Sequence, residues 1–204
     1  MNNKLETLSQ KASNEVKLDQ DLLLLTIVSS LIASYAIKMD SIYVLIGSML
    51  VSPLFDPIIA TAVFLTLGDF KLFLKSIKSL LISLLLAFVI SAVFWFVLKN
   101  FQSDINIVPT LNFPSIDNFV VAFLIGIVGT LLWIWPKSSN TSAGVAVAIS
   151  LVPPIANTMF SLFWGYTEHA KYNIFIFLIN ILGIFVGSIL ILTIYSKGKH
   201  KTRL

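Results

Sequence analysis

The chain has 204 residues, of which 57% are hydrophobic and 12% charged, and its mean hydropathy is +0.91. This composition excludes an ordinary soluble domain and is typical of an integral membrane protein. Because the sequence has no cysteine, it also excludes a disulfide framework and any thiolate nucleophile or metal ligand. The isoelectric point of about 9.3 comes from Lys and Arg that flank apolar segments. We therefore expect these basic residues to set the orientation in a membrane, and expect no nucleic acid as a partner.

Apolar segments follow one another along the chain after a mixed-charge start. Residues 1–20 place Leu5, Leu8, Ala12 and Val16 at helical spacing, which predicts an amphipathic helix on the membrane surface, with a partly disordered tail as the alternative. Six segments are then expected to cross the bilayer: residues 22–37, 42–67, 72–98, 118–135, 142–164 and 173–195. The predicted organisation is an N-terminal segment at 1–20, a first unit at 21–98, a polar linker at 99–117, a second unit at 118–195 and a basic tail at 196–204.

Two of these six segments contain prolines near their middle. The second carries Pro53 and Pro57, and the fifth carries Pro153 and Pro154. Neither pair fits an unbroken α-helix, because each proline lacks an N–H and its ring crowds the carbonyl four residues earlier. In hydrocarbon the freed backbone groups must find partners within the protein or in trapped water. We therefore expect a broken helix at each pair, and these breaks are the first place to look for function.

An internal repeat relates the two interrupted segments. At an offset of 97 residues, positions 47–91 lie over 144–188 without a gap, and 14 of the 45 pairs are identical. Because shared Leu and Ile are common in any apolar segment, the matched glycine, proline and threonine weigh most: Gly47/Gly144, Pro57/Pro154, Thr61/Thr158 and Gly68/Gly165. Each unit holds three spans, and since three is odd, the second unit enters the membrane from the opposite side. The predicted fold class is all-α, with six transmembrane helices in two inverted three-helix repeats.

The distribution of basic residues predicts an orientation. With the N-terminus inside and six crossings, eleven Lys and Arg fall on the inside and three, Lys38, Lys99 and Lys171, on the outside. If the interrupted segments were re-entrant hairpins, the division would be eight to six. The positive-inside rule therefore favours six crossings, with both termini in the cytoplasm.

Asp56 is the acid that lies well inside an apolar segment. An ionisable group within a span is costly, and such a carboxylate is typical of a proton or cation site. The structural alternative is an N-cap for the second half-helix, with Pro57 at the first helical position. The two roles are compatible, and both stay open.

Polar side chains near the breaks complete the candidate path. Ser48 and Ser52 are expected either to satisfy freed carbonyls or to line a path, and Asn180 and its repeat partner Ser83 to point into the bundle. The candidate solute or ion path consists of Asp56, Ser52, Ser48, Thr61, Asn157, Thr158 and Asn180, and the breaks of Pro53, Pro57, Pro153 and Pro154.

Residues 47–58 (GSMLVSPLFDPI) and 144–155 (GVAVAISLVPPI) resemble the two signature stretches of a bacterial and archaeal membrane family catalogued as domain of unknown function 389. Asn180 also fits an asparagine that is usual in this family. The resemblance covers residues 21–195. Since glycine usually occupies the position of Asp56 in the family, the resemblance implies no family-wide role for this carboxylate. It implies a multispanning inner-membrane protein and names no transported species.

The sequence contains no nucleophile–base pair, phosphate-binding glycine loop or metal-ligand cluster, so we expect neither an enzyme nor a bound cofactor or metal. The prediction is a membrane transporter or channel for a small solute or ion, with its site where the broken helices cross near the bilayer midplane. The alternative is a non-transporting membrane scaffold or sensor subunit. The expected partners are the lipid bilayer and the unidentified solute, and homo-oligomerisation is a further expectation, because six spans leave much lipid-facing surface.

Overall fold

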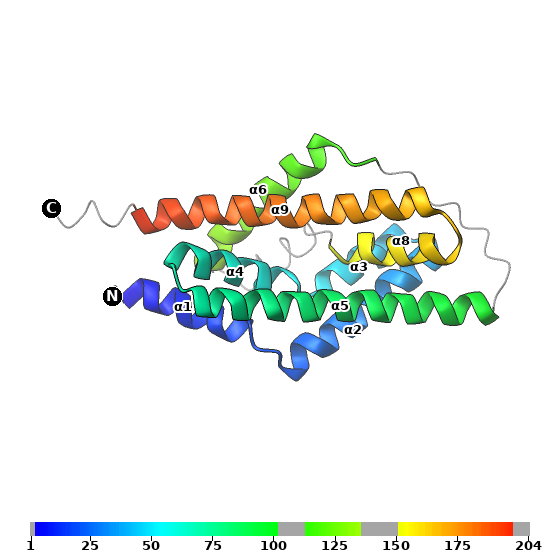
Figure 1. Ribbon diagram of the computed structural model, residues 1–204, viewed down its shortest axis with the longest axis horizontal. Helices are drawn as coiled ribbons and strands as arrows, with labels where there is room; N and C mark the ends of the chain where they lie inside the picture. The colour runs from blue at the N-terminus through cyan, green and yellow to red at the C-terminus, as the bar shows by residue number, and fades with distance from the viewer. Residues whose placement is uncertain (1–2, 102–112, 136–150, 198–204) are drawn as a thin grey trace.

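The computed structural model describes residues 3–101, 113–135 and 151–197, and within these ranges it consists of helices joined by short turns (Figure 1). The predicted all-α class is confirmed. The helices are α1 (Asn3–Glu15), α2 (Gln20–Lys38), α3 (Ile42–Val51), α4 (Phe55–Leu67), α5 (Phe70–Phe101), α6 (Ile116–Ile134), α8 (Val152–Phe163) and α9 (Thr167–Lys197).

Four of the described helices, α2, α5, α6 and α9, are long and apolar enough to cross a bilayer. The pair α3 and α4 makes a fifth candidate if the two are counted as one span, bent by 45° at the break between them. The chain is therefore a multi-pass membrane protein by the length and composition of its helices. The first half of the predicted span at 142–164 lies outside the described residues, and so does most of the predicted linker at 99–117.

The two longest helices, α5 and α9, run in opposite directions and form the length of the molecule (Figure 1). The short helices α4 and α8 lie between them, and each contacts both long helices. The N-terminal end of α1, the α4–α5 turn and the C-terminal end of α9 lie at one end of the molecule, at the left in Figure 1. The C-terminal end of α5 and the α8–α9 turn lie at the other end.

Many large apolar side chains face outward, whereas serine and alanine make up much of the buried helix faces. Along α5 the exposed apolar residues recur at helical spacing: Leu74, Leu81, Leu85, Val89, Val93 and Phe96. The buried face of the same helix carries Ser76, Ser79, Ser83, Ala87 and Ser91. This pattern is the one expected in lipid, where apolar side chains need no protein cover and small residues let helix backbones approach closely.

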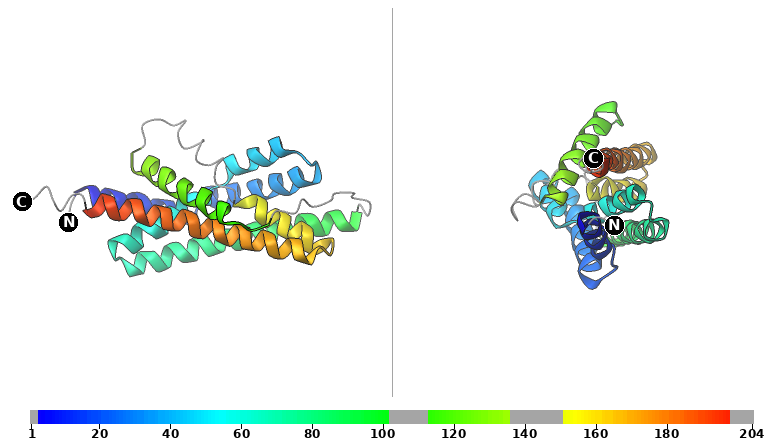
Figure 2. Two further views of the ribbon diagram at one scale, coloured as in Figure 1. Left: turned by 90° about the horizontal axis from the view of Figure 1, so that it is seen from above. Right: turned by 90° about the vertical axis from the view of Figure 1, so that its left-hand side faces the viewer.

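The tightest helix contact joins α6 to α9, which crosses it obliquely (Figure 2). Gly126 of α6 and Gly183 and Gly187 of α9 form this seam. A Cβ on Gly183 would lie 2.6 Å from the Cβ of Ala122, and a Cβ on Gly126 would collide with the backbone of Ile184. Gly183 and Gly187 form a GxxxG motif, which allows such close packing of membrane helices. This motif is visible in the sequence, but the prolines and charges alone do not predict the seam.

The N-terminal helix α1 corrects one prediction. It is helical, as the spacing of its apolar residues predicts, but its apolar face does not lie free for insertion into lipid. Leu8, Ala12 and Val16 are buried in one cluster with Ala60 and Val63 of α4. Lys11 fixes the other side, because its Nζ donates to the carbonyl of Trp133 at 2.7 Å and lies 4.3 Å from the centroid of that indole ring. Contacts with α4 therefore bury the apolar face that was expected to lie on the membrane surface.

Candidate functional site

The first proline break separates α3 from α4. Helix α3 ends at Val51, and α4 begins at Phe55 with Leu54 at its N-cap position and no side-chain cap bond. The predicted N-cap role of Asp56 is therefore wrong. The helix begins earlier because Leu54 and Phe55 pack in the core, and Asp56 falls within the first turn, where a negative charge complements the helix dipole. The charged side chains that act on its carboxylate are Glu15 and Lys11 of α1.

The second proline pair opens helix α8. Val152 is the first residue of α8, so Pro153 and Pro154 both lie in its first turn. Proline is tolerated there, because the first backbone N–H groups of a helix have no intrahelical acceptor in any case. Both proline side chains are buried.

The starts of α4 and α8 meet in the core. Leu54 and Ile58 from the first break share one buried cluster with Leu151, Val152 and Ile155 from the second. These five side chains are at most 1% exposed. The two breaks therefore lie together in space, although about a hundred residues of sequence separate them.

A cavity of about 580 Å³ adjoins the second break and lies between α3, α6, α8 and α9. Its size is that of a small-molecule site. Apolar residues of α3 and α6 form much of its wall. The polar and proline residues that line it come from three helices: Asp117 and Asn118 from α6, Pro153, Pro154 and Asn157 from α8, and Asn173 and Asn180 from α9.

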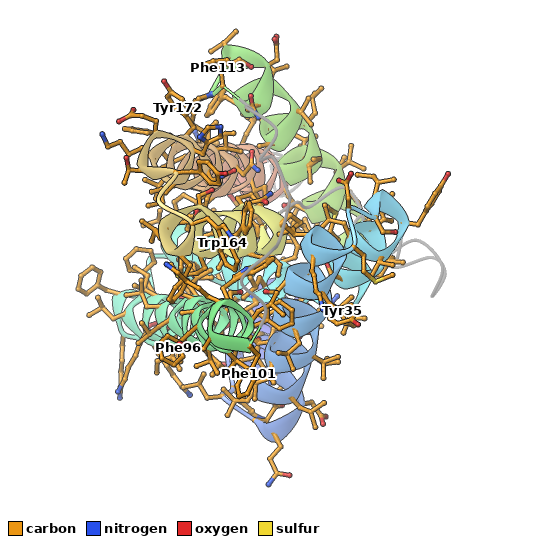
Figure 3. All side chains as sticks on the ribbon, turned by 90° about the vertical axis from the view of Figure 1, so that its right-hand side faces the viewer. Tyr35, Phe96, Phe101, Phe113, Trp164 and Tyr172 are labelled. Carbon is orange, nitrogen blue, oxygen red and sulfur yellow. The ribbon has the colours of Figure 1, made fainter. Side chains whose placement is uncertain are left out.

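Exposed side chains mark where the cavity reaches the surface. Asp117 is exposed, as is Phe113, which lines the cavity just ahead of α6. The Phe113 ring packs against Tyr172 at the start of α9, with the ring centroids 5.2 Å apart, and Figure 3 shows the two side by side. The cavity thus extends from the proline break in the core toward the N-terminal ends of α6 and α9.

Hydrogen bonds fix the polar groups nearest this opening. The Oδ1 atom of Asn118 accepts from the backbone N–H of Ser115 at 3.1 Å and from its hydroxyl at 2.8 Å. The Nδ2 atom of Asn173 donates to the carbonyl of His169 at 2.9 Å. Both amides are therefore held in one orientation by hydrogen bonds within the protein.

Of the residues predicted to form the path, the cavity lining unites Asn157 and Asn180 with Pro153 and Pro154. The described lining does not include the remaining candidates, which lie elsewhere. The hydroxyls of three of them donate to backbone carbonyls within their own helices: Ser48 to Leu45 at 2.6 Å, Thr61 to Pro57 at 2.7 Å and Thr158 to Pro154 at 2.7 Å. Ser52, at the end of α3, donates its backbone N–H to the carbonyl of Met49, and Asp56, in the first turn of α4, lies within electrostatic range of Glu15 and Lys11 of α1.

Asp117, Asn118 and Asn173 line the cavity but were not predicted to do so. Asp117 and Asn118 lie in the first turn of α6 and Asn173 in the second turn of α9, and polar residues are ordinary near helix ends, so their type carried no signal. What brings them to the break is the packing of α6 on α9, which the GxxxG motif of α9 could have indicated.

Comparison with known proteins identifies relatives but no function. A family model described as domain of unknown function (DUF389) matches residues 49–186, more than half of the chain. An uncharacterized protein of Methanocaldococcus jannaschii is 33% identical over 198 residues, which are 96% of this chain and 61% of that protein. No solved structure matches the chain. The resemblance found in the proline-bearing stretches is thereby confirmed.

Proposed function

The chain belongs to the family described as domain of unknown function (DUF389), and from this premise we propose that it is a membrane transporter or channel for a small solute or ion. The observation that carries the proposal is a cavity that adjoins a proline break inside an apolar helical protein and whose lining includes an aspartate and four asparagines. Interrupted helices at the bilayer midplane form substrate sites in secondary transporters, because they expose backbone groups where a continuous helix exposes none.

The proposed architecture is six spans in two inverted three-span repeats, with the second span of each broken at prolines. Matched local geometry supports it. Thr61 and Thr158, which are 97 residues apart, each donate to a proline carbonyl at 2.7 Å. Gly68 and Gly165, also matched, both take left-handed backbone angles, with φ of 74° and 81°. The opposite directions of α5 and α9 fit an inversion between the units (Figure 1). A sixth crossing requires that the segment preceding α8 completes the predicted span at 142–164.

In the proposed orientation, the protein lies in the inner membrane and both termini lie in the cytoplasm. Lys71, Lys75 and Lys78 begin α5, and Lys197 ends α9, so these basic residues lie at the end of the molecule that also holds the N-terminal end of α1. At the opposite end of the molecule, α5 ends and α9 begins. The excess of Lys at the first end supports a cytoplasmic location for it. The cavity, which adjoins the N-terminal half of α9, then lies toward the outer side.

The test is flux through purified full-length protein in liposomes, with protons, alkali cations, small anions and small organic solutes as probes. We expect a saturable flux that Asn157→Ala reduces, because Asn157 lines the cavity one turn into α8. Asn100→Ala is the matched control, since Asn100 is exposed at the end of α5 and outside the described cavity lining. A folded, correctly oriented protein that carries no probe would contradict the proposal and favour a scaffold or sensor subunit.

A further inference from the structure

The described cavity lining carries negative charge and no positive charge. Among the described lining residues, Asp117 is the one ionisable side chain, and none is Lys, Arg or His. Its carboxylate lies near the opening, because Asp117 is exposed in the first turn of α6. An anion entering here would meet a negative charge and no positive one, whereas a cation would meet a counter-charge.

The start of α8 offers little to an anion. Half-helix N-termini can bind anionic groups of a substrate through their free N–H groups. At this N-terminus, however, two of the first three residues are Pro153 and Pro154, which have no N–H. The helix end that faces the cavity is therefore poor in the donors that an anion needs, and the same two prolines line the cavity.

The remaining polar groups suit an organic guest better than a bare metal ion. A cavity of about 580 Å³ holds roughly twenty waters at about 30 Å³ each. A bare Ca²⁺ or Mg²⁺ requires six or more oxygens at close and defined distances. Within the part of the chain that the structure describes, no group of three or more Asp, Glu, His or Cys could hold a metal ion. The carboxamides of Asn157 and Asn173 and the carboxylate of Asp117 are instead spread over three helices, as hydrogen-bonding positions for a larger molecule.

We propose that this cavity binds a small organic cation of the ammonium class, with the Asp117 carboxylate as its counter-charge at the opening and the asparagine amides as its hydrogen-bonding groups. The apolar wall from α3 and α6 then contacts the carbon skeleton of the guest. This inference rests on the proposed function, because it takes the cavity as the solute site. It adds the charge and chemical class of the solute.

Binding to the detergent-purified full chain tests the inference, with methylammonium, ethanolammonium and choline as cations, acetate as an anion and glycerol as a neutral solute. Measurements at low ionic strength are needed, because Asp117 is exposed and salt screens exposed charges. We expect saturable binding of at least one cation in preference to acetate and glycerol. Asp117→Asn should weaken it about tenfold or more, as for loss of a charge-assisted hydrogen bond.

Asp40→Asn is the matched control. Asp40 is exposed in the α2–α3 turn, is absent from the described cavity lining, and has a φ of 50° that asparagine also adopts. It removes the same charge and should leave cation binding unchanged. Absence of cation binding, or equal effects of the two substitutions, overturns the inference. If acetate or glycerol binds and crosses the liposome membrane while the cations do not, the inference fails but the transporter proposal stands. If no probe of any charge crosses the membrane, the transporter proposal fails too.

Discussion

The glycine seam between α6 and α9 allows a sharp test of the packing that builds the cavity. In Gly126→Ala the new Cβ would collide with the carbonyl oxygen of Ile184, and in Gly187→Ala it would collide with that of Phe123. A backbone atom cannot rotate away as a flexible side chain can, so the two helices must separate. Overpacking of this kind costs about 1–3 kcal/mol. Each substitution should therefore lower the ratio of folded to unfolded protein by roughly 5- to 150-fold, since about 1.4 kcal/mol is a factor of ten.

The assay is reversible unfolding in mixed micelles of increasing SDS content, followed by the fluorescence of the four tryptophans. Gly47→Ala is the control, because a Cβ at Gly47 in α3 would meet no atom within 4 Å. It should change the free energy of unfolding by less than about 0.5 kcal/mol or increase it slightly, since alanine favours helix more than glycine does. If Gly126→Ala and Gly47→Ala unfold alike, α6 does not approach α9 as closely as the structure shows. The reasoning on the seam would then be refuted.

Three further predictions concern topology and helix contacts. Because the chain has no cysteine, the single variants Met39→Cys and Lys71→Cys can each be labelled with a membrane-impermeant maleimide. We expect the two positions to be labelled from opposite sides of the membrane. Labelling from the same side would show that α3 and α4 form a re-entrant hairpin. Trp95→Phe should lower the free energy of unfolding by about 1–2 kcal/mol in the SDS assay, because it removes a buried hydrogen bond of 3.1 Å from the indole N–H to the carbonyl of Ala156. An unchanged midpoint of unfolding would contradict this. Lys11→Met should speed amide hydrogen exchange in α1, because it removes the charged contact with α6 but keeps an apolar stem; unchanged protection would show that apolar packing alone holds α1.

Local signals in the sequence predicted most of the helices well. Gly68 ends α4 in the left-handed conformation, as a glycine after an apolar run indicates. The assignment of Asp56 as an N-cap failed because the rule considers only the capping residue. Burial of Leu54 and Phe55 in the core favours an earlier helix start than the capping preference of Asp56 alone predicts. Tertiary packing likewise decided what covers the apolar face of α1, and no pattern within residues 1–20 contains the α4 surface on which it packs.

The cavity was predictable only in part, because its lining comes from segments far apart in the chain. The proline pair and Asn157 were found because a break in a long apolar run is visible within one window of sequence. Asn180 was found through the repeat and the family resemblance. Asp117, in the first turn of α6, and Asn173, in the second turn of α9, look like ordinary polar residues near helix ends, and only the close crossing of the two helices makes them line one cavity.

Positions matched at the 97-residue offset differ in side-chain chemistry between the two breaks. The 97-residue offset pairs Asn157 with Ala60 and Asn180 with Ser83. Ala60 is fully buried in the cluster under α1, whereas Asn157 is half-buried and lines the cavity. At these two pairs the second stretch thus carries an amide where the first carries a small residue, alanine or serine. The matched glycines take similar backbone angles in both stretches, whereas the two amides occur in only one of them. Under the proposed function, this difference favours the start of α8, whose residues line the cavity, over the start of α4 as the part of the described chain that selects the solute.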